Sequence, residues 1–163
     1  MVAVIIIVGI LWIGSIIIVS FLNTKWIWGI ADQEYIKEYR KTMKFKTYYN
    51  TLVSWMKLLE NGKSICDCFD SDEKIAVYGM GEIGKLICRE LKRGDKRLKY
   101  GMDQNAFGYD TDIGLMVYSS DVEVEKVDCF IISMSNMADK IVPVIEDKAD
   151  RIMTIDEVIA NIL

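Results

Sequence analysis

The sequence contains no histidine and only one proline among its 163 residues. Without histidine, catalytic triads of the Ser-His-Asp type, histidine-ligated metal sites and histidine pH switches are excluded. The length and a hydrophobic content of 52% suit one small folded domain and exclude a long multidomain enzyme. Any chemistry must therefore come from other side chains or from the backbone.

Charged side chains are absent from Met1 to Thr24, and small residues alone interrupt the apolar run Val2 to Leu22. As a helix this run measures roughly 31 Å, the thickness of the hydrocarbon core of a bilayer. It lacks the basic start and the small-residue cleavage site of a signal peptide, so we expect an uncleaved transmembrane anchor over residues 1–24. Basic residues follow the run, which predicts a single-pass protein of the cell membrane with most of the chain in the cytoplasm.

Residues 25–73 are predicted to link this anchor to a domain through an amphipathic helix. Apolar residues recur there at spacings of three and four, Asp32 is placed to cap the helix and Gly62 to end it. Up to Lys63 the chain carries 8 basic and 4 acidic side chains, and the remainder carries 12 basic and 20 acidic ones. The basic part suits anionic lipid headgroups or simply a solvated helix surface, and the acidic remainder argues against nucleic-acid binding.

The four cysteines do not have the spacing of a metal site. Cys66 and Cys68 form a Cys-x-Cys pair, whereas Cys88 and Cys129 stand alone. Zinc sites usually combine Cys-x₂₋₄-Cys pairs with two further ligands at similar spacing. We therefore predict no metal and interpret the cysteines as small buried thiols.

A glycine motif carries the strongest functional signal. The strand candidate Lys74–Tyr78 leads directly into Gly79-Met80-Gly81-Glu82-Ile83-Gly84, and a helix is expected from Lys85 to Arg93. Strand, glycine turn and helix in this order are typical of dinucleotide-binding folds. The glycines permit a tight turn, the approach of a pyrophosphate and close packing of the helix, whose N-terminus attracts the anion. The motif is therefore predicted to bind a cofactor.

Asp103 follows the next strand candidate, Leu98–Met102, and lies nineteen residues after Gly84. A carboxylate at this place can accept hydrogen bonds from ribose hydroxyls. No arginine lies nearby for a 2′-phosphate, so NAD or a sugar nucleotide is preferred over NADP as the cofactor. In an alternative interpretation, Glu82 stabilises the helix N-terminus in place of a phosphate, and the turn binds nothing.

The remaining pattern completes an α/β domain over residues 74–163. We predict a small Rossmann-type parallel sheet of about five strands with helices on both faces. The further strand candidates are Leu115–Tyr118, Val127–Ile132 and Arg151–Ile155. Ser133 and Ser135 are candidate ligand contacts, although Ser135 or Asn136 as the cap of the next helix is favoured. Pro143 is expected to kink that helix or mark its start, and Asp156 to cap a final helix.

The sequence provides no acid–base pair for catalysis. No lysine has a tyrosine four residues before it, so the Tyr-x-x-x-Lys pair of short-chain dehydrogenases and sugar-nucleotide epimerases is absent. We therefore assign no catalytic residue. An NAD-dependent oxidoreductase or epimerase would need a group such as Tyr109 or Asp110, or a partner chain. A third interpretation is a protein-interaction module with a relict glycine turn.

Three segments resemble a known group of proteins. The runs Ile75–Leu86 and Tyr100–Ala106, with the preceding Trp55–Ser64, resemble small NAD(P)-binding Rossmann-like domains of bacterial cell-surface polysaccharide systems. More distantly, they are similar to the N-terminal nucleotide-binding region of membrane-anchored polysaccharide epimerases, whose separate catalytic domain has no counterpart here. The resemblance implies an accessory or sensing subunit in cell-envelope polysaccharide assembly, partnered by membrane-bound polysaccharide or glycosyl-transfer enzymes.

Overall fold

The computed structural model describes residues 2–106 and 108–163, and between residues 2 and 31 it describes side chains only at 12, 14–16 and 19–21. The chain divides into two compact units, Met1–Phe45 and Lys46–Leu163. The elements in chain order are α1 (Val2–Glu60), η1 (Ile65–Cys68), β1 (Lys74–Tyr78), α2 (Glu82–Arg93), β2 (Arg97–Asp103), β3 (Gly108–Asp110), β4 (Leu115–Ser119), β5 (Val127–Ile132), η2 (Ser135–Met137), α3 (Ala138–Ile145), β6 (Ala149–Thr154) and α4 (Ile155–Ile162).

Helix α1 corrects the predicted anchor. In the part of the chain that the structure describes, no helix has a stretch that is both long and apolar enough to cross a membrane. The predictions of a transmembrane helix over residues 1–24, of a single-pass membrane protein and of a membrane location are therefore contradicted. Contrary to the prediction from its composition, the uncharged run is not a separate element but the first part of one helix of 59 residues that also carries charged side chains.

The same helix corrects the predicted start of the linker, but its predicted end is present. Asp32 lies inside α1 and caps nothing, because the helix passes through it without a break. At the other end, Gly62 has a φ of +69° and the amide of Lys63 donates to the carbonyl of Leu58 at 3.1 Å. Glycine adopts this left-handed conformation at little cost, which is why the helix ends here.

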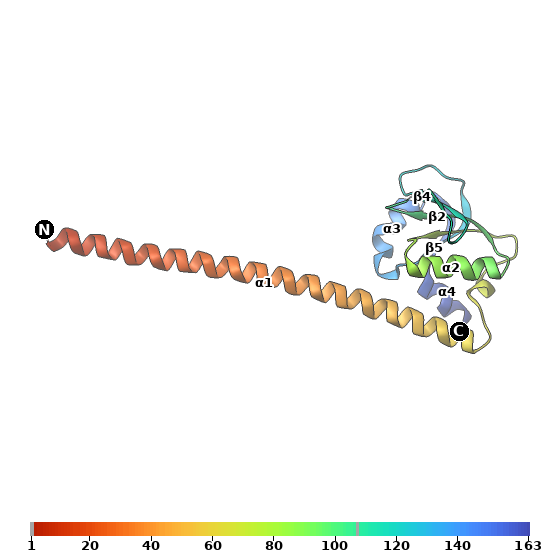
Figure 1. The fold of residues 1–163 in the computed structure, drawn as a ribbon, viewed down its shortest axis with the longest axis horizontal. Helices are drawn as coiled ribbons and strands as arrows, with labels where there is room; N and C mark the ends of the chain where they lie inside the picture. Colours follow the sequence, from red (N-terminus) through yellow and green to blue (C-terminus); the bar gives the residue numbers. More distant parts are fainter. Residues whose placement is uncertain (1, 107) are drawn as a thin grey trace. The chain divides into compact units, whose positions relative to one another are not determined.

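The sheet has six strands in the order β3-β4-β2-β1-β5-β6. Five of them are parallel, and the chain runs from β1 through β2 to β4 on one side and then returns to β5 and β6 on the other. Helices α2 and α4 cover one face, and α3 covers the other (Figure 1). The strand order reverses between β1 and β5, and open α/β sheets bind ligands beside the carboxyl ends of the strands at such a point.

The predicted sheet of about five parallel strands is wrong in two respects. The sheet is mixed, because β3 pairs antiparallel with β4, and it has six strands. Strand β3 consists of three residues, Gly108-Tyr109-Asp110, of which Tyr109 alone carries a large apolar side chain. Such a segment has no period-two pattern to reveal it, and its pairing with β4 decides its conformation.

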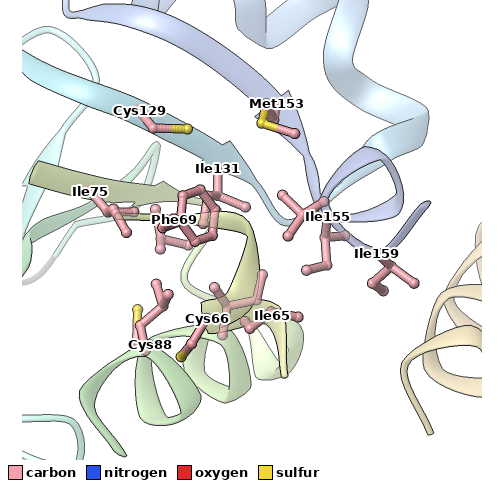
Figure 2. Close-up of a cluster of buried hydrophobic side chains, with 14 of the residues drawn as sticks. Ile65, Cys66, Phe69, Ile75, Cys88, Cys129, Ile131, Met153, Ile155 and Ile159 are labelled. Atoms are coloured by element: carbon pink, nitrogen blue, oxygen red, sulfur yellow. The ribbon is translucent and has the colours of Figure 1, made fainter. Parts of the chain in front are cut away.

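Alternating side chains of the central strands build one core on each face of the sheet. Ile75 and Val77 of β1 point to the face covered by α2 and α4, while Ala76 and Tyr78 point to the face of α3. Figure 2 shows the first of these clusters, in which side chains of β1, β5 and β6 meet those of η1, α2 and α4. Both faces of β1 are buried, so the residues that follow it are held in a fixed position.

The helices after β5 begin differently from the prediction. Neither Ser135 nor Asn136 caps α3, which starts after Met137 without a side-chain cap. Pro143 lies inside α3, five residues after its first residue, and so does not mark its start. Thr154 caps α4 through a reciprocal pair of hydrogen bonds with Glu157, and Asp156 instead accepts a hydrogen bond of 2.6 Å from the hydroxyl of Thr51.

Candidate functional site

The predicted glycine motif forms the turn between β1 and α2. Gly79 has a φ of +87°, and its amide donates to the carbonyl of Met102 at 2.8 Å. A Cβ on Gly84 would lie 2.0 Å from the carbonyl oxygen of Gly79, so the helix can approach the turn this closely only because residue 84 is glycine. The first and third glycines therefore fix the turn itself.

Gly81 has a different role, because the space in front of it is open. It precedes the first residue of α2 with a φ of −70°, and a Cβ built on it would meet nothing within 4 Å. Gly81 has no side chain to cap the helix, and Glu82 lies in the first turn of α2, where its charge also favours the helix N-terminus. An anion can thus approach the N-terminal amides of α2, toward which the helix dipole attracts negative charge.

Asp103 lies at the end of β2 and faces this turn. One carboxylate oxygen accepts a hydrogen bond from the amide of Met80 at 2.7 Å, and the other accepts one from the amide of Asn105 at 3.0 Å. Two carboxylate oxygens offer about four acceptor positions, so capacity remains for ribose hydroxyls. The carboxylate is thereby held in a fixed orientation beside the glycine turn.

A cavity of about 580 Å³ opens beside the turn, on the side of β2 and β4. Its volume is in the range of small-molecule sites. Of the nine predicted site residues, Met80, Gly81 and Asp103 line it. The other six are not among its lining residues: Gly79, Glu82, Ile83, Gly84, Ser133 and Ser135. The full lining consists of Met80, Gly81, Lys85, Asp103, Asn105, Gly108, Tyr109, Asp110, Thr111, Asp112 and Val117.

The two predicted serines are placed apart from this cavity. Ser133 is 3% exposed, and its hydroxyl donates to the carbonyl of Gly79 at 2.7 Å. It therefore holds the glycine turn against the end of β5. The hydroxyl oxygen of Ser135 is buried and has no hydrogen-bond partner among the described residues.

Lys85 is a cavity residue that the sequence analysis did not identify. Its ammonium lies 3.1 Å from a carboxylate oxygen of Asp110 and 3.7 Å from one of Asp112, which also pairs with Arg89 at 2.7 Å. The hydrogen bond with Asp110 raises the pKa of Lys85 and lowers that of Asp110, so both stay charged near neutral pH. The sequence contains one signal for this contact: basic residues at positions 85, 89 and 92, which share one face of a helix.

Tyr109 and Asp110, the groups considered for acid–base chemistry, both line the cavity. Tyr109 is 60% exposed. Asp110 is held as a carboxylate by Lys85, because the lowered pKa of Asp110 disfavours its protonated form. A general acid needs a proton to give, so this geometry does not make Asp110 one.

Three of the four cysteines, Cys66, Cys88 and Cys129, are buried, and all four are free thiols. Burial raises the pKa of Cys88 and of Cys129 to about 12, since a thiolate is poorly solvated in the core. Among the residues that the structure describes, no group of histidine, cysteine or carboxylate side chains has the arrangement of a metal site.

Comparisons of the chain with protein-family models, with curated proteins and with solved structures found no match.

Proposed function

We propose that this domain binds a dinucleotide such as NAD, or a sugar nucleotide, at the carboxyl edge of its sheet. One observation carries the proposal: Gly81 and Asp103 line the same cavity, and the space in front of Gly81, at the start of α2, is open. A phosphate at the helix N-terminus and a ribose on Asp103 are the two contacts by which such folds hold a nucleotide. The accessory or sensing role in cell-surface polysaccharide assembly belongs to the same proposal and rests on the sequence resemblance.

The residues present fit the phosphate of such a ligand. The space in front of Gly81 is open, since an added Cβ would meet nothing within 4 Å, and the backbone amides at the start of α2 supply donors. They also fit a ribose, because Asp103 is oriented by the Met80 amide and lies at the cavity wall. This chain's residues bind and orient a ligand, and the proposal includes no chemical step.

The test is a titration of the full chain with NAD, 5′-AMP and UDP-glucose, followed by thermal unfolding. A ligand that binds only the native state raises the melting temperature, by an amount that corresponds to about 2.7 kcal/mol at a concentration of 100 times Kd. We expect at least one of the three nucleotides to raise it. A well-folded chain whose melting temperature is unchanged by all three at millimolar concentration would overturn the proposal.

Two variants assign the effect to this site. Gly81→Asp places a carboxylate in the open space before α2, so it is expected to remove the shift while the chain still folds. Asp150→Asn, on the distant strand β6, removes an exposed carboxylate without touching the cavity and should keep the full shift. A shift that persists in Gly81→Asp would place the nucleotide elsewhere on the chain.

A further inference from the structure

The cavity has a second end, where the turn between β3 and β4 meets helix α2. Lys85 reaches Asp110 and Asp112 from the helix, Arg89 pairs with Asp112, and Lys92 donates to the carbonyls of Ile113 and Gly114 at 2.6 and 2.9 Å. Three basic side chains along one helix face thus hold the β3–β4 turn. Of the three, only Lys85 lines the cavity.

Negatively charged side chains outnumber positively charged ones on the cavity wall. The described lining residues include three carboxylates, those of Asp103, Asp110 and Asp112, and a single cation, Lys85. That cation is already shared between two of the carboxylates. A further phosphate on the ribose, in addition to the pyrophosphate held at the start of α2, would therefore meet negative charge and no uncommitted positive charge on this wall, and bringing such an anion out of water without a partner is costly.

We propose that Asp110 and Asp112, by holding Lys85, make the cavity select nucleotides whose ribose carries free hydroxyls and reject those with a phosphate on that ribose. The inference rests on the proposed nucleotide site and names its ligand class. Asp103 accepts the ribose hydroxyls, and the two aspartates of the β3–β4 turn keep the lysine from serving a phosphate there. Asp110 and Asp112 are thus specificity-determining residues.

Removing the two aspartates should reverse this selectivity, because Lys85, the cation that a ribose phosphate would need, is already present at the cavity. In the double variant Asp110→Asn/Asp112→Asn, Lys85 loses both carboxylate partners and the wall loses two negative charges. A phosphate would then find a free ammonium in place of an occupied one. The remaining aspartate, Asp103, still faces the turn through the Met80 amide.

The experiment compares NAD and NADP, which differ only by one ribose phosphate, by equilibrium binding to the full chain. The wild type is expected to prefer NAD at least tenfold. In the double variant, we expect the ratio of the two Kd values to move at least tenfold toward NADP. Adding Lys85→Met to the double variant should abolish that gain, and Asp150→Asn should leave the wild-type ratio unchanged because its carboxylate pairs with Lys126 on the far edge of the sheet.

The other outcomes overturn the inference, and each also shows whether the proposed nucleotide site itself stands. Equal affinity of the wild type for NAD and NADP, or a ratio unmoved in the double variant, would overturn the selectivity while binding itself stands. A gain in NADP affinity that survives Lys85→Met would show that capture of Lys85 does not set the preference. If neither dinucleotide binds, the inference is overturned, and the titration with UDP-glucose decides whether the nucleotide site stands.

Discussion

The amide of Met80 donates a hydrogen bond of 2.7 Å to the carboxylate of Asp103, and this contact joins the glycine turn to the end of β2. The carboxylate that the sequence assigned to a ribose is thus also part of the turn's own structure. Its second oxygen accepts from the Asn105 amide at 3.0 Å, which ties the following loop to the same point. If the proposed nucleotide binds at Asp103, stability and ligand binding depend on the same carboxylate.

Asp103→Ala is expected to destabilise the chain as well as to remove nucleotide binding. The Met80 amide would lose its acceptor, and an unsatisfied donor of this kind costs about 1–3 kcal/mol. Asp103→Asn keeps one acceptor oxygen, so it should cost less. Urea unfolding of both variants measures the difference. Equal stability of Asp103→Ala and the wild type would mean that water replaces the carboxylate without loss.

Gly84→Ala and Gly81→Ala form a matched pair. An added Cβ at Gly84 would lie 2.0 Å from the carbonyl oxygen of Gly79, so the turn or the helix must move, at a cost of about 1–3 kcal/mol. At Gly81 the added Cβ meets nothing within 4 Å, and the φ of −70° suits any residue. We expect Gly84→Ala to lower the denaturant midpoint clearly and Gly81→Ala to change it little. The reverse order would contradict the described turn.

Glu90→Ala should weaken the packing of three elements at once. The Glu90 carboxylate accepts hydrogen bonds from the indole of Trp55 at 2.7 Å, the hydroxyl of Ser64 at 2.6 Å and the amide of Ile65 at 3.0 Å. Its removal leaves these donors unsatisfied, and we expect a loss of about 2–4 kcal/mol in the free energy of unfolding. Glu90→Gln keeps one acceptor oxygen and should lose less, and chemical denaturation followed by fluorescence compares the two.

The ion pair between Lys85 and Asp110 predicts a pH dependence of stability. The pKa of Asp110 is lowered from its usual 3.8, so its contribution is present above that value and is lost as the pH falls below it. The pKa of Lys85 is raised from its usual 10.5, so its contribution is present below that value and is lost at still higher pH. The stability difference between the wild type and Asp110→Asn should therefore be level from about pH 5 to about pH 10 and shrink outside that range. A difference that is the same at pH 3 and pH 7 would exclude this pair as its source.

The thiols should differ sharply in reactivity. The pKa values of Cys88 and Cys129 are about 12 because both thiols are buried, so their thiolate fraction at pH 8 is negligible. Cys68 is the thiol that is not fully buried, and we expect it to react first with a disulfide reagent in the native chain. The Cys68→Ser variant should then lack the fast phase, whereas a fast phase that remains would show that a core thiol is accessible.

The central part of the fold was readable from the sequence because its signals are local. Strand β5 has the predicted bounds Val127–Ile132, since an unbroken run of mostly apolar residues is typical of a strand buried on both faces. The glycine turn was equally readable, because Gly79 and Gly84 are required by backbone geometry. The conformation of these residues follows from the local sequence and does not depend on distant parts of the chain.

The parts that were missed depend on partners far away in the sequence. Asp156 suggested a helix cap, yet its carboxylate accepts from Thr51, more than a hundred residues earlier, and Thr154 takes the cap instead. Lys85 could not be predicted as a cavity residue, because its partner Asp110 lies on a hairpin that forms only when β3 pairs with β4. Likewise, a count of uncharged residues did not reveal that α1 continues without a break to Glu60.

The short strand β3 has a consequence for the behaviour of the protein in concentrated solution. It covers the outer side of β4 with only three residues, and on the opposite edge β6 exposes the charged side chains of Asp150 and Arg151. Long, flat, uncharged edges are the ones that recruit strands from other chains. Both margins of this sheet are therefore protected against the edge-to-edge growth that leads to aggregation.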